Sequence, residues 1–390
     1  MNVVHYFLRV SEASGGVSRA IYDLVSLMAA VGHEVALATA ADSRFPQAWF
    51  TSGRGTPEIV TFKPPPKPFE LLSRASLAKI GSSLQEAEML HLHGLWRPSS
   101  SQVAGLARRL RKPYVMTIHG TLDDWSMRQR PVRKRIYHRL FEMRNLAAAG
   151  RIHATAWAEA EQARKWIPHG RIAVIPYAFD LAPFAQPPGR ELFLAAHPEV
   201  DARRTTVLFL SRLHPKKGAE ILIRAVGMVR RTGVDCQLLM AGPGKASYLN
   251  RLRQLAASHV PDALFLGMVT GEEKHALYRF ADVLALPTSQ ENFGLVFTES
   301  LACGTPVVTT RGTDIWSELE SSGGALIAEP TAEAFAVAIV TLLSDSQRRQ
   351  RMGRDGRRWV FDWLERRKVV DRYERLYREA AANGIGRTGA

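Results

Sequence analysis

The sequence predicts an α/β fold with two Rossmann-like domains, whose parallel sheets face one another across a cleft. Short apolar segments alternate with helical patterns along the whole chain of 390 residues. A linker at residues 176–188 separates two halves of similar organisation. Glycine-rich and charged motifs follow several of the apolar segments, which is where open α/β sheets bind ligands.

The bulk composition limits the class of protein. With 46% hydrophobic residues, the chain has enough apolar material for packed cores, and its length suits two or three domains. No apolar run reaches the length of a membrane-spanning helix, and the chain starts with a predicted strand rather than a signal peptide. Cys236 and Cys303 have neither metal nor disulfide spacing. We therefore expect a cytoplasmic protein.

The first half, residues 1–180, is predicted to form one domain. After a glycine turn, Val17, Ile21 and Leu24 share one helical face. Strands are expected at residues 2–7, 34–39, 58–62, 89–93, 114–118, 151–154 and 172–175, and helices near 17–31, 69–84, 99–110, 131–149 and 158–166.

The second half, residues 181–360, repeats this alternation, and residues 361–390 are predicted as a further C-terminal helix. Residues 345–381 are helical and strongly basic. Strands are expected at residues 206–210, 237–241, 263–266, 283–286, 306–309 and 325–327, and helices at 218–230, 247–258, 271–280, 295–302 and 331–343.

A net charge of +15 favours an anionic partner, such as nucleic acid, an acidic membrane or a phosphorylated substrate. One basic cluster has apolar residues between its charges, a pattern typical of an amphipathic helix on an anionic bilayer. A solvated helix face with core contacts on its other side explains the pattern equally well. The cluster consists of Arg128, Arg130, Arg133, Lys134, Arg135, Arg139 and Arg144.

Two acidic residues flank a glycine turn in the second half. Glu291 precedes Gly294, and Glu299 lies in the apolar helix that follows. Such a turn directs the amino end of the helix at a ligand, where backbone N–H groups and the helix dipole favour a phosphate. Because both carboxylates can accept hydrogen bonds from hydroxyl groups, the pattern suits a sugar nucleotide. The alternative is that both glutamates lie on a solvated face.

This stretch resembles a known enzyme family. Glu291 and Glu299 match the E-x7-E motif of retaining glycosyltransferases of family four, which have the GT-B fold. The flanking segments 287–289 and 302–308 are similar as well. The resemblance covers nearly the whole chain and is strongest over residues 206–327. It implies that the C-terminal helix at residues 361–390 crosses back to the N-terminal domain.

The resemblance implies a role for each residue of the motif. Glu299 would bind the ribose, and Glu291 would hold a hydroxyl of the donor sugar. Gly294, Leu295 and Val296 would present backbone N–H groups to the diphosphate and the sugar. The family generally works without a divalent metal or another cofactor, so neither is expected here.

Cationic residues follow the first strand of the second half. Arg212 can hold phosphate oxygens with its planar guanidinium, and Lys217 adds a point charge. With Gly218 they resemble the family's R-x4-K-G motif, although Ser211 stands where glycine is commoner. This resemblance implies that both cations stabilise the departing nucleoside diphosphate. Two exposed cations near a helix start are the alternative, and Lys216 competes with Lys217 for the role.

Two motifs of the first half match the family as well. Gly15 and Gly16 follow the first strand, where glycine lets a ligand approach the backbone, although a plain turn has the same pattern. The resemblance implies that Gly16 lies beside the donor phosphate and the acceptor. His119 ends a strand and is followed by Gly120. The resemblance implies that His119 contacts the donor sugar, and a buried structural histidine is the alternative.

Three further motifs are interpreted as secondary. His91 and His93 end a strand, and we expect only one of them to face the cleft, with no third residue to complete a metal site. Asp123 and Asp124 lack neighbouring acidic ligands and are expected on an acceptor-side surface. The loop at residues 242–244 is either close to the nucleoside or a plain turn.

The resemblance implies a retaining glycosyltransferase that moves a hexose from a nucleotide sugar to a saccharide or lipid-linked acceptor. The segments 119–144 and 312–319 look like those of bacterial enzymes of surface-polysaccharide assembly, which adds the anionic inner-membrane surface as a candidate partner. A GT-B epimerase or phosphorylase is the first alternative. A nucleic-acid-binding protein is a remote one, because the chain lacks the motifs that such binding needs.

Overall fold

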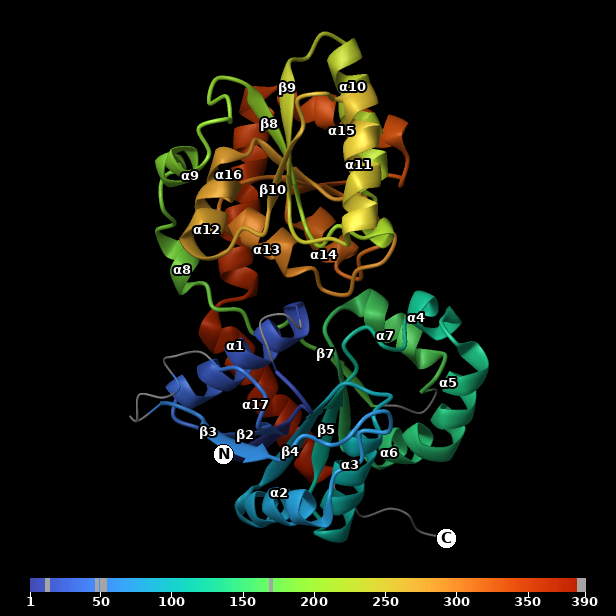
Figure 1. The fold of residues 1–390 in the computed structure, drawn as a ribbon. Helices are drawn as coiled ribbons and strands as arrows, with labels where there is room; N and C mark the ends of the chain where they lie inside the picture. The colour runs from blue at the N-terminus through green and yellow to red at the C-terminus, as the bar shows by residue number, and fades with distance from the viewer. Residues whose placement is uncertain (11–14, 46–48, 50–54, 168–170, 384–390) are drawn as a thin grey trace. The chain divides into compact units, whose positions relative to one another are not determined.

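The computed structural model describes residues 1–10, 15–45, 49, 55–167 and 171–383 (Figure 1). The chain divides into two compact units, Met1–Asp180 with Arg366–Ala390, and Leu181–Glu365. The boundary at residue 180 coincides with the sequence-based one, and the second unit extends a few residues beyond the predicted end at 360. Each unit contains one parallel sheet, as predicted.

The sheet of the first unit has the strand order β3-β2-β1-β4-β5-β6-β7, with every pair parallel. The central strands are buried on both faces, which explains their continuous apolar sequences. The strands are β1 (Asn2–Tyr6), β2 (Glu34–Ala40), β3 (Glu58–Phe62), β4 (Met89–His93), β5 (Tyr114–Thr117), β6 (Arg151–Ala154) and β7 (Ile172–Val174).

Helices cover both faces of this sheet. One apolar core joins the sheet to α2 and α3, through residues such as Ile80 and Val103. The other joins it to α1 and to α17, through residues such as Leu24 and Tyr373. The helices are α1 (Gly16–Ala30), α2 (Arg74–Glu86), α3 (Pro98–Arg109), α4 (Asp124–Arg128), α5 (Pro131–Tyr137), the π-helix η3 (His138–Glu142), α6 (Met143–Ala148), α7 (Trp157–Arg164) and α17 (Arg366–Ala382).

The sheet of the second unit has the strand order β10-β9-β8-β11-β12-β13 and is also parallel. Helices lie on both sides of it (Figure 1). Its strands are β8 (Thr205–Leu210), β9 (Cys236–Ala241), β10 (Leu264–Gly267), β11 (Val283–Ala285), β12 (Val307–Thr309) and β13 (Ala325–Ile327). Its helices are α8 (Ala182–Ala185), α9 (Arg190–Ala196), the 3-10 turn η4 (Pro215–Lys217), α10 (Ala219–Arg231), α11 (Ala246–His259), α12 (Gly271–Phe280), α13 (Leu295–Ala302), α14 (Trp316–Ser321), α15 (Ala332–Leu343) and α16 (Ser346–Trp363).

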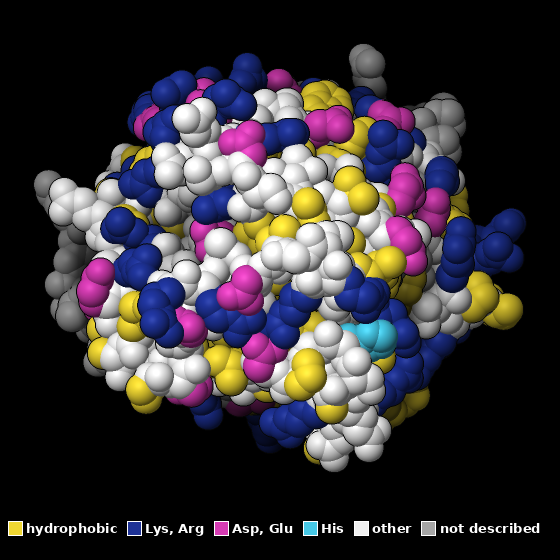
Figure 2. Space-filling model, turned by 90° about the horizontal axis from the view of Figure 1, so that it is seen from above, with side chains coloured by type: hydrophobic (Ala, Val, Ile, Leu, Met, Phe, Trp, Pro, Cys, Tyr) yellow, Lys and Arg dark blue, Asp and Glu magenta, His cyan; other side chains and the backbone are white. Residues whose placement is uncertain are grey.

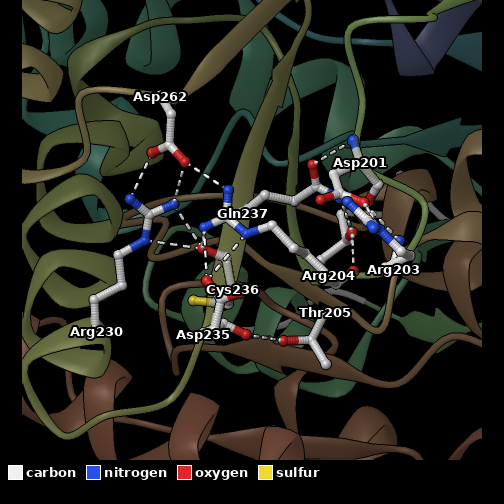
Figure 3. Close-up of polar contacts among 10 residues, drawn as sticks. Asp201, Arg203, Arg204, Thr205, Arg230, Asp235, Cys236, Gln237 and Asp262 are labelled. Carbon is white, nitrogen blue, oxygen red and sulfur yellow. Dashed lines mark hydrogen bonds and ion pairs between the residues drawn. The ribbon is translucent and has the colours of Figure 1, made fainter.

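An ion-pair network joins the segments at the amino ends of β8 and β9 (Figure 3). Arg204 and Arg230 both donate to the carboxylate of Asp262, at 2.6 and 2.5 Å, and both donate to the backbone oxygen of Cys236. Arg204 also pairs with Asp235 at 2.8 Å. Because ligands bind at the opposite edge of a parallel sheet, we interpret this network as structural.

The structure corrects three sequence-based boundaries. The helix predicted at 131–149 is interrupted by the π-helix η3, and the basic helix at 345–381 is divided into α16 and α17 at residues 364–365. The segment 176–188 is not only a linker, because it contains α8. No helix in the described part of the chain is long and apolar enough to cross a bilayer.

Candidate functional site

The predicted turn before α13 has a conformation that favours glycine. Gly294 is the N-cap of α13 and has a φ of 65°. A Cβ atom added there would lie 2.6 Å from the ring of Phe297 and 2.9 Å from the side chain of Glu291. No side chain caps the helix, and Phe297 N–H donates to Gly294 at 2.9 Å. Among the described residues, the N–H groups of Leu295 and Val296 are therefore left for a ligand.

Lys217 and Glu291 form an ion pair between the loops that follow β8 and β11. The Lys217 side chain is only 4% exposed, and that of Glu291 is 23% exposed. Burial, together with the nearby cations Lys216 and Arg212, lowers the pKa of Lys217. The carboxylate of Glu291 opposes this shift, because an adjacent negative charge favours the ammonium form. Two residues that the sequence predicted for the site, Lys217 and Glu291, therefore contact one another.

Backbone contacts fix the same two loops. Ser289 N–H donates to the carbonyl oxygen of Lys216 at 2.8 Å, and Lys216 Nζ donates to Gln290 at 2.9 Å. Lys216 is thereby directed to Gln290, whereas Lys217 is directed to Glu291. Gly218 follows with a φ of 70°, and a Cβ atom on it would collide with the carbonyl of Pro287. In this motif Lys217 therefore supplies a charge, whereas Gly218 is required because a side chain there would collide with the neighbouring loop.

Further cations surround His214 in this loop. Besides burial, the nearby charges of Lys216, Arg212, Lys245 and Lys217 lower the pKa of His214. Arg212 itself is exposed, and no acceptor within the described part of the chain holds its guanidinium. The local potential at the carboxyl end of β8 is therefore positive, which suits an anionic ligand. Elsewhere, basic side chains are interspersed with acidic ones, as the face in Figure 2 shows.

Glu299 is buried, and its side chain is 9% exposed. One carboxylate oxygen accepts from Lys274 Nζ at 2.8 Å and the other from Tyr278 OH at 2.9 Å. Both donors come from α12, so this helix orients the glutamate. Since a carboxylate has about four lone-pair sites, Glu299 keeps acceptor capacity for ligand hydroxyls. The sequence reasoning missed Lys274 and Tyr278, whose helical spacing of four residues was the available signal.

Asp314 is a second residue that sequence reasoning missed. Its backbone N–H donates to Glu291 O at 2.9 Å, and its carboxylate accepts from Asn292 Nδ2 at 3.1 Å. Glu291 N–H in turn donates to Gly312 O at 2.8 Å. The loop after β12 thus fixes the backbone on which Glu291 stands. The loop at 242–244 packs on the same side, since Leu213 N–H donates to Pro243 O at 2.7 Å.

The predicted residues of the first unit follow β1 and β5 in the sequence. Gly16 begins α1, and Gly15 before it has a φ of 76°. His119 has a φ of 49° and uses both ring nitrogens within the protein. Its Nε2 contacts His93 Nδ1 at 3.1 Å, and its Nδ1 contacts Tyr177 OH at 2.7 Å. Asp123 caps α4, and Asp124 pairs with Lys165 at 2.7 Å, so these two carboxylates have separate structural partners.

The prediction for His91 and His93 was wrong in two respects. Both side chains point to the same face, because residues two apart in a strand do so. A third histidine is also present, since β1 pairs with β4 and places His5 opposite His91. Nitrogen atoms of the three rings lie within 4.8 Å of one another.

Three imidazoles are suitable ligands for Zn²⁺ or Cu²⁺. Here, however, the ring nitrogens of His91 contact Tyr377 OH at 2.9 Å and Thr117 Oγ1 at 2.6 Å, and His5 Nδ1 contacts His93 Nε2 at 3.0 Å. We therefore interpret the group as a hydrogen-bond network.

Two family models match the chain. "Glycosyltransferase Family 4" matches residues 14–182, and "Glycosyl transferases group 1" matches residues 194–359. A GDP-mannose-dependent alpha-(1-6)-phosphatidylinositol monomannoside mannosyltransferase of Mycolicibacterium smegmatis is 30% identical over 271 residues, covering 66% of this chain and 68% of the relative. The phosphatidyl-myo-inositol mannosyltransferase of Mycobacterium leprae is 29% identical and covers 96% of this chain and 95% of its own length.

Solved structures share the fold. The sucrose-phosphate synthase from Thermosynechococcus elongatus has a TM-score of 0.75 at 21% identity and covers 98% of this chain and 99% of its own. Anabaena Alr3699/HepE in complex with UDP-glucose has a TM-score of 0.74 at 19% identity, with coverage of 96% and 99%. These structures show that the chain has the GT-B fold, in which each of two units contains a parallel sheet. Together with the family models and the mannosyltransferase relative, they show that the chain is a glycosyltransferase of family 4 with the GT-B fold.

Proposed function

We propose that this glycosyltransferase moves a hexose from a nucleotide-diphosphate sugar to a saccharide or lipid-linked saccharide, with retention of the anomeric configuration. The observation that carries the proposal is the Lys217–Glu291 pair beside the uncapped amino end of α13. A cation, an acid and open N–H groups are what the diphosphate and the hydroxyls of such a donor require.

The diphosphate is proposed to bind the cationic side of this site. Arg212 is exposed and able to contact two phosphate oxygens at once, while Lys217 is buried and held in place by Glu291. The N–H groups of Leu295 and Val296 add neutral donors. Charge that develops on the leaving diphosphate is then stabilised by groups that are already in position.

The donor sugar and the nucleoside are proposed to bind the acidic side. Glu291 contacts Lys217 through Oε2, and its other carboxylate oxygen, Oε1, accepts a hydrogen bond from a hydroxyl group of the sugar. Glu299, oriented by Lys274 and Tyr278, accepts from the ribose. Both roles need the carboxylates to be ionised.

The reaction needs no separate base in this proposal. The bond between the anomeric carbon and the diphosphate oxygen breaks, and a bond to the acceptor oxygen forms on the same face of the sugar. The acceptor hydroxyl gives its proton to an oxygen of the leaving diphosphate. Arg212 and Lys217 supply the positive charge, so we propose that the reaction proceeds without a bound metal or another cofactor.

The acceptor is proposed to be lipid-linked, and the enzyme to act in glycolipid or polysaccharide synthesis at the cytoplasmic face of the bacterial inner membrane. The helix α5 has no buried residue, and exposed apolar side chains continue into η3 and α6. Val132, Ile136, Leu140, Phe141 and Met143 are between 49% and 68% exposed. With the exposed Arg128, Arg130, Arg133, Arg135, Arg139 and Arg144, they form what we call the basic apolar surface, which suits an anionic bilayer.

A donor panel tests the proposal. The purified chain would be incubated with UDP-, GDP-, ADP- and dTDP-hexoses, with and without membrane lipid extract, and the product linkage would be read by NMR. We expect acceptor-dependent release of one nucleoside diphosphate and an unchanged anomeric configuration. Turnover without any acceptor would point to an epimerase, dependence on inorganic phosphate would point to a phosphorylase, and an inverted product would contradict the retaining mechanism.

A further inference from the structure

A line of polar side chains crosses the apolar interior of the first unit. The strand register places His5 opposite His91, His93 opposite Thr117, and Thr117 opposite His153. All of these residues are buried, on the face of the sheet that α1 and α17 cover. Buried polar groups of this kind are retained only with hydrogen-bond partners, so their arrangement is specific.

One branch of this network leads to His119. His5 Nδ1 contacts His93 Nε2 at 3.0 Å, and His93 Nδ1 contacts His119 Nε2 at 3.1 Å. On its other side, His119 Nδ1 contacts Tyr177 OH at 2.7 Å. A small cavity of about 10 Å³ lies beside it and is lined by His93, His119 and Tyr177 among others.

His5, at the opposite end of this series of hydrogen-bonded rings, determines which nitrogen donates in each contact. Burial lowers the pKa of both His5 and His119 to about 3, so each neutral ring has one N–H group and one lone pair. His5 Nε2 is buried, and no residue that the structure describes bonds to it. A buried N–H group without an acceptor is destabilising, whereas an unpaired buried acceptor is found more often in folded proteins.

His5 therefore has its proton on Nδ1 and donates to His93 Nε2. His93 must then have its own proton on Nδ1, and it donates to His119 Nε2. Because His119 accepts at Nε2 and its neutral ring has one proton, that proton is on Nδ1, which donates to the oxygen of Tyr177. Each of the three rings is thus held in the Nδ1–H tautomer.

We infer that His93 is a positioning residue for sugar transfer, because it fixes His119 as the Nδ1–H tautomer and so makes it a hydrogen-bond donor toward the substrate. The inference rests on the proposed function and on the role that the family resemblance implies for His119, which is contact with the donor sugar. In that contact a sugar hydroxyl oxygen takes the place of the Tyr177 oxygen as the acceptor of Nδ1–H. No proton leaves the ring, and His93 stays bonded to Nε2.

A matched pair of variants tests this role. His93→Asn keeps a side-chain amide donor for His119 Nε2, whereas His93→Leu has nearly the same size and no hydrogen bond. The full chain would be labelled with ¹⁵N-histidine, and the ring nitrogens of His119 would be assigned by the loss of signals in His119→Gln. Tautomers are then read from the ¹⁵N shifts, and thermal unfolding shows that both variants fold.

We expect the Nδ1–H pattern for His119 in the wild type and in His93→Asn, and a mixture of tautomers in His93→Leu. The kcat of His93→Leu should fall about tenfold, with KM for the donor changed less than about threefold, and His93→Asn should recover most of the loss. An Nε2–H pattern in the wild type, or an unchanged tautomer in His93→Leu, would overturn the inference. Absence of transfer from every donor would instead refute the proposed function, while the spectra still decide the tautomer.

Discussion

Lys217 and Glu291 lie 74 residues apart in the sequence and form an ion pair at the carboxyl ends of β8 and β11. The strands β8 and β11 are neighbours in the sheet, so the loops that follow them emerge side by side. The pair thus joins the two sequence motifs into one site. It also explains why the lysine is tolerated in a position where its side chain is only 4% exposed.

Loss of the Lys217 ammonium should impair transfer much more than donor binding. In Lys217→Met the leaving diphosphate loses a preorganised charge, so we expect kcat to fall about 100-fold. Glu291→Gln and the double variant complete a double-mutant cycle, measured by steady-state kinetics and by urea unfolding. The two effects should be strongly non-additive, because the residues contact one another. Additive losses would mean that the pair does not act as a unit.

Arg212 should contribute mainly to diphosphate affinity. Its guanidinium is exposed and has no acceptor among the described residues, so Arg212→Met should raise the Kd of the nucleoside diphosphate about tenfold with little effect on stability. Isothermal titration at two salt concentrations measures this. The control is Arg203→Met, which removes the same charge at the amino end of β8, where the side chain is 91% exposed. An equal change in both variants would show a nonspecific charge effect.

Two glycines that flank α13 distinguish the cost of a left-handed backbone from the cost of a steric clash. Gly294 and Gly304 both have positive φ values, of 65° and 83°, but a Cβ atom on Gly304 would meet no atom within 4 Å. Gly304→Ala should therefore cost about 1 kcal/mol, the penalty of the left-handed conformation alone. Gly294→Ala should cost more, because of Phe297 and Glu291, and should also weaken donor binding. Equal unfolding free energies and unchanged binding in both variants would contradict this geometry.

The ion-pair network in Figure 3 should contribute a pH-dependent part of the stability. Arg230 and Arg204 hold the pKa of Asp262 at about 2, below its ordinary value of 3.8, despite partial burial. A carboxyl whose pKa is lowered in the folded state stabilises the protein at pH values above the pKa that this group has in the unfolded chain. The stabilisation is lost as the pH falls toward about 2, the pKa in the folded state.

Asp262→Asn should therefore lower the urea midpoint at neutral pH, and the difference from the wild type should shrink as pH falls below about 4. Because the Asp262 side chain is 45% exposed, the effect should be about 1 kcal/mol or less. Glu329→Gln, an exposed carboxylate of the same unit, is the control. A difference that stays constant from pH 7 to pH 3 would show that the charge on Asp262 is not responsible.

The basic apolar surface should bind anionic vesicles through its side chains. Replacing Ile136 and Leu140 by serine should weaken binding to phosphatidylglycerol vesicles about tenfold in a sedimentation assay, while the nucleotide affinity stays unchanged. Val337→Ser removes an apolar side chain of similar exposure, 69%, from the second unit and is the control. Lys134 is left in place, because it donates to Ser126 at 2.6 Å and has a structural role. Equal binding of all variants would exclude this surface as the contact.

The alternation of apolar strands and helices was enough to predict both sheets, because the central parallel strands are buried on both faces and therefore have continuous apolar sequences. The motifs around Arg212 and Glu291 could be found because their residues are close together in the sequence. The residues that contact these motifs and the histidines could not be found, because they are distant in the sequence. Lys274 and Tyr278 reach Glu299 from another helix, and His5 reaches His93 only through the register of β1 with β4.

The interruption of the helix predicted at 131–149 by η3 was likewise not predictable from periodicity. The buried Glu142 of η3 has a partner distant in sequence, because its carboxylate accepts from Trp96 N–H at 2.9 Å. Burial raises the pKa of Glu142 to about 7. A local pattern of charges and apolar residues does not contain this information.

The most direct test of the central claim is the binding of nucleoside diphosphates at Glu299. UDP, GDP, ADP and dTDP would be titrated into the wild type, Glu299→Gln and Arg203→Met by calorimetry. We predict that one of the four binds at micromolar concentration, that Glu299→Gln weakens this binding at least tenfold by removing the charged acceptor of the ribose hydroxyls, and that Arg203→Met leaves it unchanged. Binding that is equally tight in Glu299→Gln, or no binding of any of the four, would contradict the claim that this site holds the donor nucleotide.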